Sequence, residues 1–200
     1  DQQGAAPGRF KYQDVNNDGV ITPDDRTFLG SPNPDFTAGV NLNFRYKNLD
    51  ASAILYSSYG NEAVNTIKTY TDFFGTYTGI KSNKLSNAWS PDNPNSNIPV
   101  IENQNSFSTA GVFNSYFVED ASFLKLRSLM IGYSIANSPI VEAVKVDKFR
   151  IYLQASNLFT LTKYTGLDPE IIGSTSSFGV DWANYPNNEL VLLLGVNLTF

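Results

Sequence analysis

The sequence lacks the residues on which much catalytic and metal chemistry depends. Its 200 residues include no cysteine and no histidine, which excludes a disulfide framework, a thiolate metal site and a histidine general base. Charged residues make up only 16% of the chain, against roughly 25% in an average soluble domain. The net charge of −5 argues against a nucleic-acid partner, because phosphate binding needs clustered Lys and Arg. An enzyme built from this chain would have to use carboxylates, hydroxyls or lysine.

Long apolar runs are missing as well. No stretch reaches the ~18 consecutive apolar residues that a membrane-spanning helix needs. Barrel strands escape this test, because about 9–11 residues of alternating apolar and polar character are enough to cross a membrane. The chain is 42% hydrophobic and 14% aromatic, and it is rich in Asn, Ser and Thr. This composition suits a sheet with one apolar and one polar face.

Apolar and polar residues alternate with a period of two in several segments, which predicts β-strands. Lys47-Asn48 is a plausible two-residue turn in which Asn tolerates positive φ, and such a turn would pair Tyr46 with Leu49. The alternation changes phase near Ser128, which predicts a β-bulge. The predicted strands cover about 36–46, 49–59, 116–135, 147–160 and 189–200.

The connections between these strands alternate between short and long. They cover 47–48, 60–115, 136–146 and 161–188. The two long ones are polar, and 60–115 is predicted to be structureless. An up-and-down sheet places alternate connections at opposite ends, and outer-membrane barrels have short periplasmic turns and long extracellular loops. Five strands are too few to close, and open edges cannot face hydrocarbon.

The predicted fold class is therefore all-β, with antiparallel up-and-down strands that form the C-terminal part of a large transmembrane β-barrel. Residues 36–200 would supply the strands, and residues 1–35 would belong to an extracellular loop.

The segment DVNNDGVITPDD, residues 14–25, matches a calcium loop of the EF-hand or dockerin type. Hard oxygen ligands at alternate positions are what calcium requires. The Glu that usually closes such a loop is replaced by a shorter Asp, and flanking helices are not evident. A turn rich in Asn, Asp and Gly that binds no ion explains the same residues. The predicted metal ligands are Asp14, Asn16, Asp18, Val20 (through its backbone carbonyl) and Asp25.

Several polar and aromatic residues outside this loop have both a functional and a structural interpretation. Four aromatic residues could stack on sugar rings or simply pack in loops and at interfaces: Trp89, Tyr164, Trp182 and Tyr185. Neighbouring carboxylates could serve a glycoside hydrolase or merely be solvated: Glu119, Asp120, Asp168 and Glu170. Three arginines at polar strand positions could bind anions or pair with carboxylates inside the wall: Arg45, Arg127 and Arg150.

Five segments resemble the closing part of SusC-like (SusC/RagA family) TonB-dependent transporters. In the family's order they are FKYQDVNNDGVITPDDRTFLGSPNPDFTAGVNLNFRYKNLDAS, NAWSPDNPNSNIPV, YFVEDASFLKLRSLMIGYSI, FRIYLQASNLFTLTKYTGLDPE and DWANYPNNELVLLLGVNLTF. The resemblance implies a barrel in the Gram-negative outer membrane that is filled by an N-terminal plug, energised by TonB and lidded by a SusD-like lipoprotein. It implies import of oligosaccharides or peptides rather than an enzyme. The ending Gly195–Phe200, Gly-x-x-apolar-x-aromatic, resembles a barrel-assembly signal.

Two other classes stay open from the residues alone. One is a secreted β-sandwich with a calcium loop that acts as a carbohydrate-binding or adhesion module. The other is a carboxylate-dependent glycosidase. A sandwich would bury its apolar faces against each other and dissolve without detergent, whereas a barrel wall would not.

Overall fold

The computed structural model describes residues 1–75, 78–136, 138–139, 141, 146–171, 173, 176–183, 185–186 and 188–200. The chain divides into two compact units. The loop unit comprises Asp1–Pro32, Ala63–Glu119 and Ile171–Asn184. The sheet unit comprises Asn33–Glu62, Asp120–Glu170 and Tyr185–Phe200. None of the helices described is long and apolar enough to cross a membrane.

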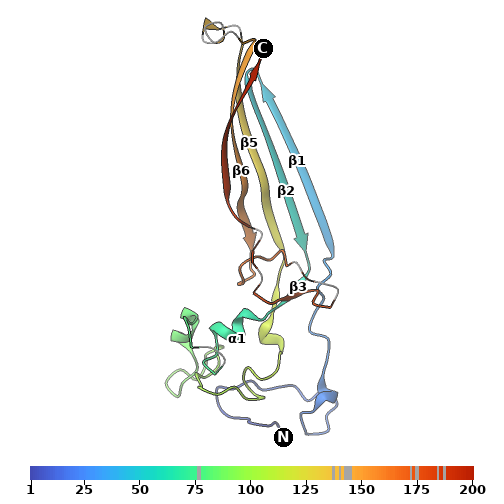
Figure 1. Ribbon diagram of the computed structural model, residues 1–200. Helices are drawn as coiled ribbons and strands as arrows, with labels where there is room; N and C mark the ends of the chain where they lie inside the picture. The colour runs from blue at the N-terminus through green and yellow to red at the C-terminus, as the bar shows by residue number, and fades with distance from the viewer. Residues whose placement is uncertain are drawn as a thin grey trace. The chain divides into compact units, whose positions relative to one another are not determined.

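The sheet unit contains one antiparallel sheet in the order β1-β2-β5-β6-β8 (Figure 1). The strand bounds are β1 Phe36–Tyr46, β2 Leu49–Tyr59, β5 Phe123–Ala136, β6 Lys148–Thr162 and β8 Val191–Thr199. Neighbours in the sheet follow one another in the chain except for the short elements between β2 and β5 and between β6 and β8. The antiparallel, up-and-down fold class predicted from the alternation is confirmed.

The predicted strand at 116–135 begins too early. Ser115–Phe117 instead forms the 3-10 helix η3, and Val118–Asp120 forms the short strand β4 of a separate sheet. The reason is that Phe117 is fully buried among other aromatic rings, which an exposed strand position would not allow. The last two strands also end differently from the predicted 147–160 and 189–200, by one or two residues at each end.

The turn between β1 and β2 pairs Tyr46 with Leu49, as the alternation predicts. The residue with positive φ is Lys47, at 53°, and not Asn48. Lysine has no side-chain group that favours this conformation, so the hairpin register, set by the apolar faces of both strands, imposes it. The predicted position of the turn is confirmed, but the residue predicted to adopt positive φ is wrong.

A β-bulge lies at Arg127, next to the predicted Ser128. The register of β5 shifts between Leu126 and Ser128 against both neighbouring strands. In β6 the partners of Ser128 and Leu126 are Ser156 and Phe159, and Asn157 between them has a φ of 53°. The prediction of a bulge from the change of phase is confirmed, and a second irregularity lies beside it in β6.

The apolar face of the sheet is exposed over much of its length, apart from Leu126 and Ala155 near the bulge, which are buried. It consists of the alternate residues of each strand that point away from the polar side, and Leu42, Leu153 and Leu194 on it are 54%, 51% and 70% exposed. Cross-strand pairing keeps these residues on one face, for example through Ile131↔Leu153 and Leu153↔Leu194. A continuous exposed apolar surface of this kind marks contact with lipid or with another protein.

Aromatic residues flank this apolar face at both ends of the strands. Phe36 stacks on Tyr59 at one end, with ring centroids 5.3 Å apart, and Tyr46 lies at the other end of β1. A rise of about 3.3 Å per residue puts Phe36 roughly 33 Å from Tyr46 along the strand. A strand tilt of about 40° reduces this to roughly 25 Å, the height of the apolar band of outer-membrane barrels between their aromatic girdles.

The loop unit is folded, so the prediction that 60–115 is structureless is wrong. The elements after β2 in this part of the chain include β3 Glu62–Asn65, α1 Ile67–Thr71 and η2 Asn83–Asn87. Strand β3 pairs in parallel with β7, Val180–Asp181, within a small sheet of order β4-β3-β7. Sequence periodicity misses these elements because each is too short to show a repeat.

An aromatic cluster forms the core of the loop unit. Phe117 is 0% and Phe73 5% exposed, and their rings lie 5.9 Å apart. Phe10 and Tyr116 pack beside them, with ring centroids 5.3 Å apart. Burial of aromatic rings from three distant segments supplies the apolar area that holds these irregular stretches together.

Several charged and polar groups inside the loop unit form ion pairs and hydrogen bonds with one another. The Nζ of Lys68 lies 2.6 Å from Glu119 Oε1 and donates to the backbone oxygen of Tyr116 at 2.6 Å. The hydroxyl of Tyr116 donates to Asp72 Oδ2 at 2.7 Å. Burial, and then the hydrogen bond to Asp72, raise the pKa of the Tyr116 hydroxyl above its usual value.

Candidate functional site

The three arginines that the sequence singles out lie on the polar face of the five-stranded sheet or at its bulge. This face carries amides and hydroxyls such as Asn43, Ser52 and Gln154 at the positions that alternate with the apolar ones. Asp50 is the one acidic residue of the five strands. The basic residues of these strands are Arg45, Lys125, Arg127, Lys148 and Arg150.

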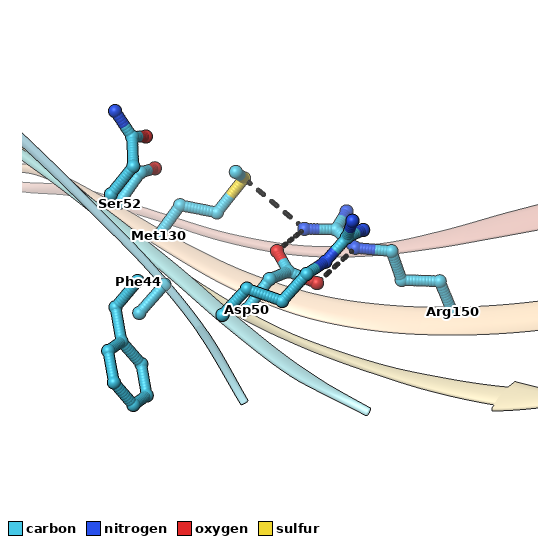
Figure 2. A pocket seen from close by; sticks show the side chains of 8 residues that line it. Phe44, Asp50, Ser52, Met130 and Arg150 are labelled. Carbon is cyan, nitrogen blue, oxygen red and sulfur yellow. Dashed lines mark hydrogen bonds and ion pairs between the residues drawn. The ribbon is translucent and has the colours of Figure 1, made fainter. Parts of the chain in front are cut away.

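An arginine of β6 crosses β5 to reach a carboxylate on β2. Arg150 Nε donates to Asp50 Oδ1 at 3.0 Å, and Nη2 donates to Oδ2 at 2.5 Å (Figure 2). A Cβ at Gly132 of β5 would lie 2.4 Å from Arg150 Nη2, so glycine is needed for the guanidinium to lie across the strand. This bidentate pair joins three strands on one face.

A second glycine of the polar face lies beneath a tyrosine ring. A Cβ at Gly195 of β8 would lie 2.2 Å from Tyr152 Cζ, and Tyr152 and Gly195 are direct partners in the β6–β8 register. The Arg150 guanidinium lies 5.0 Å from the centroid of the Tyr152 ring. The two glycines therefore let an Arg and a Tyr lie along the wall, which sequence reasoning missed because the residues pair across strands.

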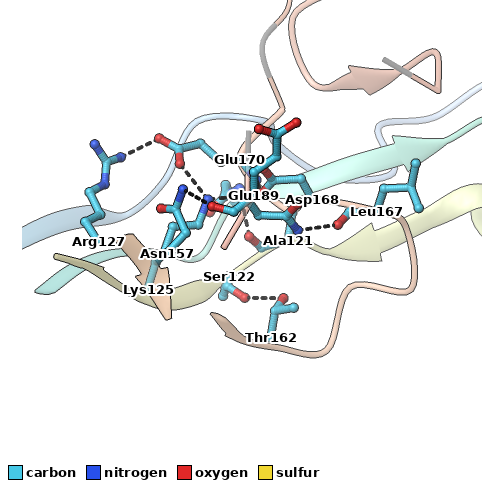
Figure 3. A network of polar contacts seen from close by, with 12 residues as sticks. Ala121, Ser122, Lys125, Arg127, Asn157, Thr162, Leu167, Asp168, Glu170 and Glu189 are labelled. Carbon is cyan, nitrogen blue, oxygen red and sulfur yellow. Dashed lines mark hydrogen bonds and ion pairs between the residues drawn. The ribbon is translucent and has the colours of Figure 1, made fainter. Parts of the chain in front are cut away.

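A second ion-pair network lies near the opposite end of β5 (Figure 3). Lys125, whose side chain is 1% exposed, lies 3.2 Å from Asp168 Oδ1 and 2.9 Å from Glu170 Oε2. Glu170 also pairs with Arg127 across the bulge, and the Arg127 guanidinium stacks 4.1 Å from the centroid of Tyr56.

Asp168 and Glu170, considered as possible glycosidase carboxylates, are thus engaged with cations of a strand. Glu119, the third candidate, pairs with Lys68.

The predicted calcium loop brings three of its five ligand residues together. Asp18 N–H donates to Asp14 Oδ1 at 3.2 Å and to Asn16 Oδ1 at 3.0 Å, and Gly19 N–H donates to Asp14 Oδ2 at 2.8 Å. The Asn16 amide donates to Asp18 Oδ2 at 2.9 Å, and Val20 N–H donates to Asp18 Oδ1 at 2.8 Å. The side chains of Asp14, Asn16 and Asp18 therefore face one turn.

Asp25 has a different role in this loop. Its carboxylate accepts from Thr22 N–H and Val15 N–H, each at 2.8 Å, as part of a capping box that begins the 3-10 helix η1, Pro23–Asp25. These two backbone hydrogen bonds, Thr22 first, hold the pKa of Asp25 below its usual range. Within the described part of the chain, no group of three or more His, Cys, Asp or Glu side chains could hold a metal ion. The predicted set differs from such a group because Asn16 and the Val20 carbonyl supply two of its oxygens.

The four aromatic residues considered for sugar stacking are divided between the two units. Tyr164 is buried, at 6% exposed, and Trp89 packs on Gly8, where a Cβ would meet its ring at 2.5 Å. Trp182 is half exposed and packs edge-on against another ring of the loop unit. Tyr185, in the sheet unit, donates to Glu189 Oε1 at 2.8 Å.

Comparisons with known proteins agree with this geometry. No family model matches the sequence. The TonB-dependent receptor P3 of Formosa agariphila is 32% identical over 205 residues, which cover 97% of this chain and 19% of the receptor. The TonB-dependent receptor SusC of Bacteroides thetaiotaomicron is 29% identical over 200 residues, covering 99% of this chain and 18% of the receptor.

Solved structures agree as well. The RagAB peptide transporter matches with a TM-score of 0.71 and 30% identity over 90% of this chain and 19% of that chain. The RagAB peptide importer in its open-open state matches with a TM-score of 0.70 and 29% identity over 96% of this chain. The chain spans about a fifth of the length of the relatives it matches. With its exposed apolar face and its match to their barrel strands, the chain belongs to the SusC-like TonB-dependent receptors of the outer membrane and corresponds to the C-terminal part of their barrel.

Proposed function

We propose that this chain is the C-terminal wall segment of an outer-membrane transporter that imports oligosaccharides or peptides with TonB-derived energy. The observation that carries the proposal is the two-faced sheet, with an exposed apolar band of about the thickness of a membrane and a polar opposite face. A soluble β-sandwich, the alternative class, would pack the apolar face against a second sheet. Here Leu42 and Leu194 remain more than half exposed.

In this proposal each face of the sheet has its own task. The apolar face meets lipid, and the polar face with Arg150, Asp50 and Tyr152 lines the interior through which substrate passes. Strands β1 and β8 are the edges of the sheet, and their free backbone groups would pair with other strands of the full barrel, because open edges cannot persist in hydrocarbon.

The proposed partners are a SusD-like surface lipoprotein, TonB, and an oligosaccharide or peptide substrate. The likeness to SusC and to a peptide transporter named RagAB supports these partners. TonB would act through a plug region outside the segment described. The folded loop unit offers a surface on which a lipoprotein could rest, since its aromatic core gives it a defined shape.

The test uses cells that express the full-length receptor and depend on it for growth on a peptide or oligosaccharide mixture. We expect the receptor in the outer-membrane fraction, uptake that stops when TonB is removed, and reduced assembly when Phe200 is deleted. The untruncated receptor in the same strain is the control. Uptake that continues undiminished without TonB would overturn the transport proposal.

We further propose that the loop at 14–25 binds calcium. The three side chains that face one turn, Asp14, Asn16 and Asp18, support this. Asp25 fits less well, because both its oxygens already accept backbone hydrogen bonds. Calcium would supply a hard cation that neutralises neighbouring carboxylates and stiffens the turn.

Limited proteolysis of the full-length receptor tests the calcium proposal. Calcium should slow cleavage within 14–25 in the wild type, and Asp18→Ala should remove that protection. Chelator should make the two proteins equal. Equal cleavage rates with and without calcium in the wild type would leave only a turn that binds no ion.

A further inference from the structure

The charges of the five strands are opposite in sign to those of the chain as a whole. The chain contains 14 basic and 19 acidic residues, yet the five strands contain only Asp50 as an acid against five basic residues. All of them lie on the polar face or at its bulge, since the apolar positions alternate with them. Clustered charge of one sign along a wall of low dielectric constant attracts ions of the opposite sign.

The two ends of this cationic face differ in how the charge is compensated. Near the bulge, Lys125 and Arg127 are paired with Asp168 and Glu170. Near the short-turn end, Asp50 is the one acidic residue of the five strands and faces several cations. It is bound by Arg150, while Arg45 and Lys148 lie near enough to interact with its charge. Positive charge therefore remains in excess at this end.

A shallow depression of about 470 Å³ lies at the end with excess charge. Its polar lining consists of Asn43, Arg45, Asp50, Ser52 and Arg150 (Figure 2). Arg45 is the direct register partner of Asp50 across β1 and β2, and it is exposed. Among the residues described, no carboxylate forms an ion pair with Arg45.

Within the proposed transporter, we propose that this depression is a binding subsite for a carboxylate group, with Arg45 as its principal ligand. Arg150 is held in place by both oxygens of Asp50, so its guanidinium is already satisfied on one edge. Arg45 keeps the planar, five-donor guanidinium that binds a carboxylate bidentately. The amide of Asn43 and the hydroxyl of Ser52, which also line the depression, supply neutral donors beside it.

The carboxylate has two possible sources, the transported cargo or another part of the receptor. Both sources present the same chemical group to Arg45. They differ in whether substitution of Arg45 changes ligand binding or the stability of the receptor. A cargo carboxylate makes binding depend on the charge of the ligand. A carboxylate of the receptor makes the stability of the folded receptor depend on Arg45 while ligand binding stays indifferent to charge.

The experiment titrates purified full-length receptor with two matched pairs of probes. One pair is a hexapeptide of alternating glycine and glutamate and its glutamine counterpart, and the other is tetragalacturonate and its methyl ester. Arg45→Gln removes the cation, and Arg45→Lys retains it. Arg26→Gln removes an exposed arginine of the loop unit and controls for net charge. Ser52→Glu places a carboxylate in the depression without removing Arg45.

For a cargo carboxylate we expect the acidic probe of at least one pair to bind about tenfold more tightly than its neutral counterpart, the scale of a charge-assisted hydrogen bond. Arg45→Gln and Ser52→Glu should both abolish this ratio, whereas Arg45→Lys and Arg26→Gln should keep most of it. For a carboxylate of the receptor, binding is indifferent to charge, and Arg45→Gln raises the rate of proteolysis of the receptor where Arg45→Lys does not.

The subsite is overturned if Arg45→Gln and Ser52→Glu change neither the binding ratio nor the proteolysis rate. Energised uptake of the same probes is measured in parallel in cells. Uptake that ignores probe charge, with no effect of Arg45→Gln on stability, removes the subsite and leaves the import proposal intact. A binding ratio that responds to Arg45 without any TonB-dependent uptake supports the subsite and overturns the import proposal.

Discussion

The loop unit and the sheet unit differ in where they place their apolar side chains. In the loop unit Phe117 and Phe73 are inside, packed against other aromatic rings. In the sheet unit the large apolar residues of β1 and β8 are exposed, and the ion pair of Arg150 with Asp50 lies on the polar face. One chain thus contains a core of the soluble kind and a wall whose apolar surface needs lipid. The two regions should therefore be sensitive to different substitutions: the loop unit to loss of buried volume, and the sheet unit to charge on its apolar face.

The largest expected effect is in the loop unit. Phe117→Ala should cost about 3–5 kcal/mol of local stability, because it leaves a cavity in a fully buried aromatic cluster. Phe28→Ala is the matched control, since Phe28 is 99% exposed, and it should change stability by less than about 0.5 kcal/mol. Hydrogen exchange of the loop unit in the full-length receptor measures both. Equal exchange in the two variants would contradict a buried core.

A charge on the apolar face should have the next largest effect. Leu42, about midway along β1 between Phe36 and Tyr46, should face the middle of the bilayer, and Leu42→Arg there should cost about 2–4 kcal/mol. Asn41→Arg, one residue away on the polar face, should cost much less. Folding into lipid vesicles, followed by gel-shift of the full-length receptor, compares the two. If Asn41→Arg impaired folding as much as Leu42→Arg, the assignment of the two faces would be wrong.

A methyl group on the polar face should have a smaller effect that depends on position. Gly195→Ala would push a Cβ into the Tyr152 ring and should cost about 1–3 kcal/mol, the range for overpacking. Gly39→Ala on β1 meets nothing within 4 Å and should be close to neutral. Tyr152→Ala combined with Gly195→Ala should recover the stability that Gly195→Ala alone loses. Urea unfolding of the receptor in detergent measures the three variants, and failure of that rescue would remove Tyr152 as the cause.

The smallest expected effect concerns acid and the turn at 14–25. Because the folded pKa of Asp25 lies below its ordinary value of 3.8, its stabilisation is complete above that value and is lost as the pH falls through the folded pKa. Asp25→Asn should therefore increase cleavage of this turn at pH 7, and the difference from wild type should shrink as the pH falls through the folded pKa of Asp25. Asp24→Asn is the control. A cleavage rate for Asp25→Asn that matched wild type at pH 7 would contradict the capping role.

The sequence predicts the sheet unit far better than the loop unit, for a physical reason. A strand with one lipid-facing side records its fold locally, in alternate residues, so β1, β2 and the bulge at Arg127 follow from the pattern alone. The core of the loop unit is made by single aromatic residues from distant segments, and no period marks them. The polar site lies between these cases. The arginines can be located by alternation, but Gly132 and Gly195 gain their meaning only from neighbours on other strands.

At the bulge at Arg127, neighbouring strands have different numbers of residues between the same two sets of paired residues. Ile54 and Leu55 are adjacent in β2, Leu126 and Ser128 enclose one residue in β5, and β6 encloses Asn157 and Leu158. At about 3.3 Å per residue, the two additional residues give β6 roughly 6–7 Å more backbone than β2 has over the same part of the sheet. The wall must bend where the strands differ in length. Loss of Arg127 alone would straighten β5 against β2 and worsen its match to β6, so insertions and deletions at this level must occur in adjacent strands together.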